Sequence, residues 1–148
     1  MSMLPYDPGV IPTKPCPSDG EIVEIYVAGL PPYKDLHQSI RNQKHRAHDR
    51  FIALRKIAIE AMAGRAWSFG NIELNIQVCG KQKQLDKSLT DYMAGIMDTL
   101  DGSSGTTFTF LPIAFEDDCQ VSKSSVALMD SAELGYWVQI VFGPTNNA

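Results

Sequence analysis

The stretch from residue 72 to residue 78 alternates strictly between apolar and polar side chains. Successive side chains of a β-strand point to opposite sides of its sheet, so this period of two predicts a strand with one buried and one wet face. The apolar positions are Ile72, Leu74, Ile76 and Val78, and the polar positions are Glu73, Asn75 and Gln77. Any fold for this chain must therefore cover one side of a sheet with other elements.

Two helices are predicted from apolar residues that recur at helical spacing. The longer runs from about Ala47 to Ala63 and is stopped by Gly64. The shorter begins after Ser88, because Ser88 and Asp91 form a capping-box pattern that satisfies amides of the first turn. The apolar stripes are Phe51, Leu54, Ile57, Ala58, Ala61 and Met62 in the longer helix, and Leu89, Met93, Ile96, Met97 and Leu100 in the shorter.

Two more strands are predicted before and after the helices. Residues 21–30 carry apolar side chains at alternate positions and end at Pro31-Pro32, since proline cannot continue a hydrogen-bonded ladder. Residues 106–115 form a strand that Pro112 makes an edge strand or a bent one.

The chain ends in two further strands, at residues 121–128 and 136–142, which the turn at 130–135 joins as a hairpin. The order of elements is then β-α-β-α-β-β-β. We expect an α+β fold, an α/β two-layer arrangement in which a mixed sheet of about four to five strands carries two helices on one face.

The chain of 148 residues has the length of one domain. Residues 1–20 form a proline-rich arm, residues 21–143 the single domain and residues 144–148 a polar tail. The sequence shows no signal peptide and no apolar run long enough to cross a bilayer, and its three cysteines form no CxxC pair. We therefore expect a cytoplasmic protein with reduced thiols and no membrane contact.

Charge is distributed unevenly along the chain. Residues 34–87 hold 11 Lys and Arg against five Asp and Glu, a balance of +6, and residues 88–148 hold one lysine against eight acids, a balance of −7. Such asymmetry indicates a basic face for a polyanion beside an acidic pocket for a metal ion. The alternative is a helix with a solvated basic side that happens to precede an acidic half.

Several segments, taken in order, resemble one nuclease family. A strand runs into Pro31-Pro32, a basic segment and a long helix lead to the alternating strand, and Asp98-Thr99-Leu100 stands at the end of the next helix. The run Asp117-Asp118-Cys119-Gln120-Val121 then opens a strand. Over residues 21–142 the chain thus resembles the RusA-type Holliday junction resolvases, which are small dimeric, magnesium-dependent endonucleases. The resemblance implies a RusA-like fold, a homodimer, a Mg²⁺ cofactor and branched DNA as substrate, in DNA recombination and repair.

The resemblance is incomplete where the family carries its chemistry. The family has an Asp-x-Asp-Asn motif with a lysine three residues later. An ungapped count back from Asp98 puts Ser88 and Thr90 at the positions of the two aspartates. The same count puts Asp91 at the position of the asparagine and Ala94 at that of the lysine. Of the family's three acidic positions, Asp118 is retained.

Three hypotheses follow from this comparison. The first is a RusA-like, Mg²⁺-dependent endonuclease acting on branched DNA, in Holliday junction resolution. The alternative is a catalytically impaired RusA-fold protein that acts as a nucleic-acid-binding or assembly module. The third, favoured by the acidic pI of about 5.3, is a metal-free structural subunit with no nucleic-acid partner.

We assign the catalytic role to Asp118, assisted by Asp117, because a phosphodiester nuclease needs carboxylates that converge on Mg²⁺. Asp91 and Asp86 are the candidates for further catalytic and metal-binding groups, if the strand at residues 106–115 packs beside the second helix and returns Asp118 towards the start of that helix. The alternatives are a solvated turn for Asp117 and Asp118, and the capping box for Asp91. For Asp86 the alternative is an ion pair with a neighbouring lysine.

Six basic residues are candidates for neutralising the phosphates of a nucleic acid. They are Arg41, Lys44, Arg46, Lys81, Lys83 and Lys87. The alternative is that these are ordinary exposed basic residues. His45 and His48 suit a transition metal only with further ligands, so we expect them to be a solvated pair.

Overall fold

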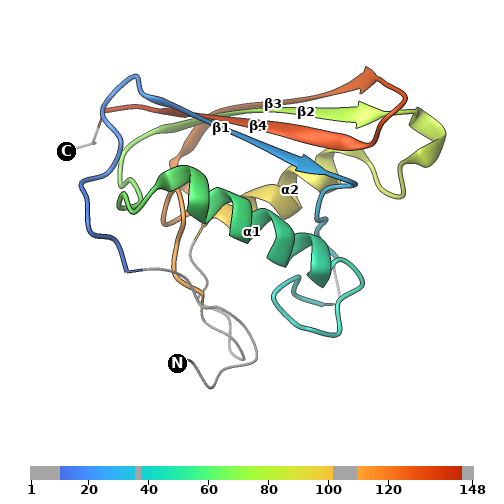
Figure 1. The fold of residues 1–148 in the computed structure, drawn as a ribbon, viewed down its shortest axis with the longest axis horizontal. Helices are drawn as coiled ribbons and strands as arrows, with labels where there is room; N and C mark the ends of the chain where they lie inside the picture. The colour runs from blue at the N-terminus through green and yellow to red at the C-terminus, as the bar shows by residue number, and fades with distance from the viewer. Residues whose placement is uncertain (1–10, 36–37, 102–109, 145–148) are drawn as a thin grey trace.

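The structure is a computed structural model that describes residues 11–35, 38–101 and 110–144 (Figure 1). Short 3-10 turns at Gln82–Gln84 and Asp118–Gln120 precede the second helix and the third strand. Neither helix of these described segments has the length and apolar character that a membrane span requires. The elements are β1 (Ile22–Ala28), α1 (His48–Met62), β2 (Ile72–Gly80), α2 (Leu89–Leu100), β3 (Val121–Asp130) and β4 (Gly135–Phe142).

The four strands form one mixed sheet in the order β1-β4-β2-β3. β4 is antiparallel to both β1 and β2, whereas β2 and β3 run parallel. Both helices lie on the same side of the sheet (Figure 1). The predicted α+β class, with a mixed sheet of four to five strands and two helices on one face, is therefore confirmed.

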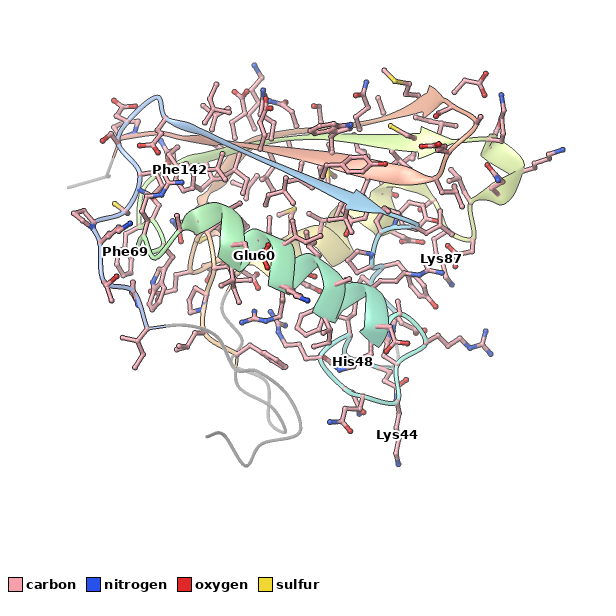
Figure 2. The ribbon with its side chains drawn as sticks, viewed as in Figure 1. Lys44, His48, Glu60, Phe69, Lys87 and Phe142 are labelled. Atoms are coloured by element: carbon pink, nitrogen blue, oxygen red, sulfur yellow. The ribbon has the colours of Figure 1, made fainter. Side chains whose placement is uncertain are left out.

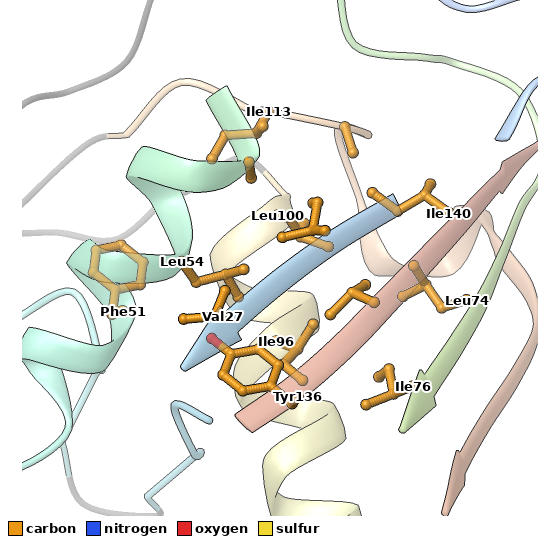
Figure 3. Close-up of a cluster of buried hydrophobic side chains, with 14 of the residues drawn as sticks. Val27, Phe51, Leu54, Leu74, Ile76, Ile96, Leu100, Ile113, Tyr136 and Ile140 are labelled. Atoms are coloured by element: carbon orange, nitrogen blue, oxygen red, sulfur yellow. The ribbon is translucent and has the colours of Figure 1, made fainter. Parts of the chain in front are cut away.

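The core lies between the inner face of the sheet and the two helices (Figure 3). Along β2 the apolar residues are buried and the residues between them are half-buried, as their alternation predicts. β1 shows the same alternation between buried and exposed residues. Buried side chains from the helices and the strands include Phe51, Leu54, Leu74, Ile96, Leu100 and Ile140.

The predicted hairpin of the last two strands is wrong, because β2 lies between β3 and β4. The connection between them passes the end of β2, where the N–H of Ser131 donates a hydrogen bond to the carbonyl oxygen of Gly80 (3.3 Å). β2 and β4 carry the buried apolar residues and occupy the centre, whereas the largely exposed β3 suits an edge. Burial of the apolar strands, rather than the short connection, decides the strand order.

The strand predicted at residues 106–115 lies partly outside the described residues, which resume at Phe110. The described part is not a strand, and Phe115 makes an isolated bridge to Ser68. Its apolar side chains are nevertheless buried: the ring of Phe110 packs edge-on against Phe51, with centroids 5.0 Å apart. The apolar pattern here reflects burial under α1, while a proline interrupts strand pairing.

α2 begins as predicted and packs closely against the segment after β1. The hydroxyl oxygen of Ser88 accepts a hydrogen bond from the N–H of Asp91 (3.1 Å), which confirms the predicted cap. Gly95 faces the backbone of that segment, because a Cβ atom at Gly95 would lie 2.4 Å from the carbonyl oxygen of Pro32. The absent side chain therefore lets α2 rest directly on residues Pro32 and Tyr33, next to the site described below.

Candidate functional site

Asp118 lies at the end of the sheet where β2 and β3 begin. The Nε2 atom of Gln120 donates hydrogen bonds to the carbonyl oxygens of Ser68 and Gly70, both at 2.8 Å, and ties this turn to the residues that precede β2. Because β3 is parallel to β2, both strands start at this end. α2 begins only after β2 has ended and returns along the sheet. Asp118 therefore lies near the C-terminal end of α2, where its charge acts on Asp98 and Asp101.

Asp101 is the most perturbed carboxyl group at this end of α2. The Arg41 guanidinium donates one hydrogen bond to Asp101 Oδ1 (2.7 Å) and another to the backbone carbonyl of Asp98. Burial raises the pKa of Asp101 to about 7, because the loss of hydration outweighs the charge of Arg41, and the charge of Asp98 adds to the increase. The Arg41–Asp101 pair thus closes the end of the helix.

Asp98 lies between the positive and negative groups of the site. Burial raises its pKa, the charges of Arg41 and Lys34 oppose this increase, and the charge of Asp118 adds to it. We call Asp98, Asp101 and Asp118 the carboxylate cluster. The charge of Lys34 lowers the pKa of both Asp98 and Asp118, so this lysine acts on the cluster electrostatically.

Asp117 and Asp118 act as a coupled pair at the rim of the cluster. Asp117 accepts a hydrogen bond from the backbone N–H of Cys119 (3.0 Å), which lowers the pKa of Asp117. A hydrogen bond shared with Asp117 is the main cause that raises the pKa of Asp118, followed by burial and by the charge of Asp117. The charge of Asp117 also raises the pKa of the Cys119 thiol, so this exposed cysteine is a poor nucleophile.

Among the described residues, neither Asp86 nor Asp91 forms a hydrogen bond with Asp118 or acts on its pKa, so their role as further metal ligands stays a prediction. Asp86 accepts hydrogen bonds from both terminal nitrogens of Arg50 (3.3 and 2.8 Å) and from the hydroxyl of Tyr92 (2.5 Å). Asp91 lies in the first turn of α2. Both are at the start of a 12-residue helix, about 18 Å long at 1.5 Å per residue, whereas Asp118 is near its other end. Sequence distance could not show that β3 starts beside the start of β2.

The cluster has the donor chemistry of a Mg²⁺ site without a complete cage. Within the described residues no three His, Cys, Asp or Glu side chains are grouped to hold a metal ion. Mg²⁺ commonly uses one or two protein carboxylates and takes its other ligands from water and substrate phosphates. Asp98 and Asp118 supply such hard oxygen ligands, while Asp101 is already occupied by Arg41. Asp98 and Asp118 are therefore carboxylates of the chemical type that Mg²⁺ binds.

Exposed cations gather near the start of α1 and the loop before α2. We call Lys34, Lys44, Arg46, Lys83 and Lys87 the basic rim. The ring of Tyr33 lies between the loop before α2 and the start of α1. Lys87 Nζ is 4.7 Å and Arg50 Cζ 5.5 Å from the centroid of this ring, and the His45 ring is 5.2 Å away. Figure 2 shows Lys44 and Lys87 towards the end of the molecule where α1 begins at His48.

The six predicted nucleic-acid-binding residues fall into two groups. Arg41 is inside the structure, with 14% of its side chain exposed, and Lys81 Nζ forms an ion pair with Asp130 Oδ1 at 3.0 Å. The other four are exposed and form no ion pair with any described residue: Lys44, Arg46, Lys83 and Lys87. These four remain available to a phosphate backbone.

The predicted solvated histidine pair is wrong, because His45 and His48 are 4% and 9% exposed. His45 Nδ1 accepts a hydrogen bond from the N–H of Ala47 (2.9 Å), and His48 Nδ1 lies 2.9 Å from the carbonyl oxygen of Ile40. Both rings hold the segment before α1 in place. Spacing alone could not separate this local packing from exposure.

Three residues of the site, Asp98, Asp101 and Lys34, were absent from the predicted set. Asp98 follows Asp91 by seven residues, which is two helical turns, so the pattern of α2 places both on one side of the helix. Asp98 also occupies the helix-end position of the family resemblance. For Lys34 the only sequence signal was its place directly after Pro31-Pro32-Tyr33.

Comparison of the chain with protein-family models and with curated proteins found no match in either case.

Proposed function

We propose that the protein is a RusA-like, Mg²⁺-dependent endonuclease that acts on branched DNA. The observation that carries this proposal is the carboxylate cluster, in which Asp98 and Asp101 of α2 meet the charge of Asp118 next to Lys34. Partly buried carboxyl groups with raised pKa values concentrate at functional sites. Asp118 is also the acidic position at which the chain agrees with the RusA-type resolvases.

In this proposal Asp98 and Asp118 hold the metal ion, and Asp101 with Arg41 holds the end of α2. A bound Mg²⁺ supplies the activation of a water molecule and neutralises charge on the phosphate. Lys34, whose charge acts on both carboxylates, would bind a free oxygen of a phosphate at this site. Cation binding also favours the ionised form of Asp98, whose burial otherwise opposes it.

The basic rim binds the phosphates on either side of the cleaved bond. Its exposed lysines and arginine release counterions when DNA binds, so affinity falls as salt increases. Because Lys34 belongs to the rim and its charge acts on Asp98 and Asp118, DNA held by the rim would also meet the carboxylates. We further propose a cytoplasmic homodimer, since symmetric cuts across a junction need two sites.

A second candidate function is a binding module that does not cleave DNA. It is favoured by the residues at the family's two other acidic positions, where the hydroxyls of Ser88 and Thr90 lie 3.1 Å apart and hydrogen-bond each other. It is also favoured by Asp86, which Arg50 and Tyr92 already occupy. In this candidate the rim binds DNA and the cluster only stabilises the end of α2.

The test is cleavage and binding of a synthetic four-way junction by the parent chain and by Asp118→Asn, with Mg²⁺ or with EDTA. The first proposal expects Mg²⁺-dependent cleavage that Asp118→Asn abolishes, with junction binding in EDTA unchanged. A Lys83→Glu/Lys87→Glu variant should weaken binding, and Lys56→Glu on α1, outside the rim, is the matched control for the charge change.

The other outcomes decide between the remaining candidates. Salt-sensitive binding without cleavage in Mg²⁺ or Mn²⁺ supports the binding module. Absence of both binding and cleavage rejects both nucleic-acid proposals and leaves a structural subunit.

A further inference from the structure

The outer face of the sheet carries two adjacent rows of side chains that cross all four strands. In the first row Tyr26, Trp137, Gln77 and Ala127 are register partners on β1, β4, β2 and β3. In the second row the partners are Glu24, Gln139, Asn75 and Ser125. Both helices lie on the opposite side of the sheet (Figure 1), so neither helix covers these rows.

The first row has an aromatic wall beside smaller side chains. The rings of Tyr26 and Trp137 lie 4.8 Å apart, and 44% of Trp137 is exposed. Next to Trp137, Gln77 and Ala127 leave room on the surface. The amide of Gln77 makes no hydrogen bond with any described residue, so its donors and its acceptor are free for a ligand.

The second row is a continuous hydrogen-bonded chain. Gln139 donates to Glu24 (3.2 Å), Asn75 donates to Gln139 (3.0 Å), and the hydroxyl of Ser125 donates to Asn75 (2.9 Å). Asn75 Nδ2 also donates to Glu73 (2.9 Å), so both N–H groups of Asn75 are used and only a lone pair of its Oδ1 remains. Gln139 Nε2 donates to Glu24 and keeps a second N–H. Together these bonds hold the amide groups in one orientation. A ligand at this row therefore meets fixed polar groups.

The two rows line a hollow of about 480 Å³, bounded by Trp137, Gln77 and Ala127 on one side and by Gln139, Asn75 and Ser125 on the other. This volume lies within the range of roughly 300–1,000 Å³ found for small-molecule sites. The hollow thus combines one aromatic surface with amides that both donate and accept hydrogen bonds.

This combination matches the chemistry of a nucleobase. A base has a flat π face that stacks on aromatic side chains, and an edge of donors and acceptors that pairs with Asn and Gln. The lining contains the carboxylate of Glu24 and no Lys or Arg, so it does not suit a phosphate. A second copy of this chain is also disfavoured, because stacking two such faces would bury Glu24 and the amides of both copies.

We propose that this hollow binds a nucleobase stacked on Trp137, with its polar edge against Gln77 and Asn75. The base comes either from a free nucleoside or from an unpaired nucleotide of a single strand. For a single strand, Lys123 supplies a cation on the same face, two positions before Ser125 on β3; it pairs with Glu73 (3.7 Å), and 74% of its side chain is exposed. The proposal stands independently of the proposed endonuclease activity.

The experiment uses the fluorescence of Trp137 as a direct reporter. The chain has two tryptophans, Trp67 and Trp137, so Trp67→Phe leaves the indole of the hollow as the only one. Adenosine, thymidine or a short oligo(dT) is titrated without Mg²⁺. Quenching that saturates is the expected result, since stacking of a base alters the emission of the indole. The nucleoside and oligo(dT) arms then identify the source of the base.

Two variants test which residues bind. Trp137→Ala and Gln77→Ala should each weaken the affinity for oligo(dT) about tenfold, which is the loss typical of one base contact. These variants keep Trp67, and their affinity is measured from the fluorescence anisotropy of labelled oligo(dT). Phe69→Ala is the matched control, because Phe69 is an aromatic residue that is 64% exposed, more than Trp137, and lies outside the hollow. Retention of nucleoside quenching by Lys83→Glu/Lys87→Glu separates this site from the basic rim.

The proposal is overturned if neither nucleosides nor oligo(dT) quench Trp137. It is equally overturned if Phe69→Ala weakens oligo(dT) binding as much as Trp137→Ala does.

Discussion

Arg50 and Asp86 form a two-point ion pair, with N–O distances of 3.3 and 2.8 Å, that joins the first turn of α1 to the loop before α2. Tyr92, from the first turn of α2, donates its hydroxyl to the same carboxylate. Burial raises the pKa of Asp86, but the hydrogen bonds from Arg50 and Tyr92 outweigh it and lower the pKa overall. A residue that the sequence suggested as a metal ligand is thus a structural link between two helices.

Asp86→Ala should therefore lower the free energy of unfolding by about 1–2 kcal/mol, because it leaves the Tyr92 hydroxyl and the Arg50 guanidinium without their acceptor. The value is modest because the pair is partly exposed, with 29% and 40% of the two side chains accessible. Urea denaturation at pH 7 measures it, with the exposed Glu133→Ala as control. Equal stability of the two variants would show that Asp86 has no structural role.

Gly95→Ala should destabilise the protein by about 1–3 kcal/mol, because the added methyl group meets the backbone of Pro32 and Tyr33 instead of a movable side chain. On helix propensity alone the same change would stabilise α2. Urea denaturation distinguishes the two effects, and Thr90→Ala on the exposed side of α2 serves as control. A more stable Gly95→Ala variant would contradict the close packing of α2 against the segment after β1.

Much of the fold was accessible from the sequence because its signals are local. The alternation at residues 72–78, the two helices and the Ser88 cap each depend on residues a few positions apart, and the structure confirms them. The apolar stripe predicted for α2 is confirmed only in part, because Ile96 and Leu100 are buried while Leu89, Met93 and Met97 are half-buried. The strand order was not accessible in this way. Placing β2 between β3 and β4 depends on which strands bury most apolar surface, and the short connection between β3 and β4 favoured the wrong pairing.

The site was predicted only in part for the same reason. Asp118 was identified from a local motif, but its partners depend on which end of α2 meets the start of β3. The parallel pairing of β2 and β3 decides this, and it selects Asp98 and Asp101 over Asp86 and Asp91. Arg41 was predicted to bind nucleic acid from its charge, whereas its position shows that it binds the end of α2.

Asp101 should make the protein less stable as pH increases from about 4 to 7. Burial raises its pKa from 3.8 to about 7 in the folded state, so the folded chain binds a proton more tightly than the unfolded chain over this range. The contribution of protonated Asp101 to the free energy of unfolding is complete below pH 3.8 and is lost as pH rises through about 7, where the folded protein releases the proton. Urea denaturation at several pH values should show a smaller decrease for Asp101→Asn. The same decrease in both proteins would contradict the raised pKa.

His45 should have the opposite dependence on pH. Burial lowers its pKa, and the charges of His48 and Lys87 act in the same direction, while Asp35 opposes them. The neutral ring accepts the N–H of Ala47, so stability is complete above pH 6.5 and falls as pH decreases through the lower folded pKa. His45→Phe cannot titrate and should lack this decrease, at a cost of about 1 kcal/mol at pH 8. Denaturation curves that respond identically to pH in both proteins would exclude His45 as the cause.

The comparison of Asp98→Asn with Asp86→Asn tests the central claim most directly, with the Mg²⁺-dependent cleavage rate of a four-way junction as the measured quantity. We expect Asp98→Asn to reduce the cleavage rate at least about 100-fold, which exceeds the loss typical of changing a residue that only supports a metal ligand. Asp86→Asn should retain the parent rate at a temperature where both variants are folded. Loss of cleavage in Asp86→Asn with parent activity in Asp98→Asn would contradict the assignment of Asp98 as the partner of Asp118.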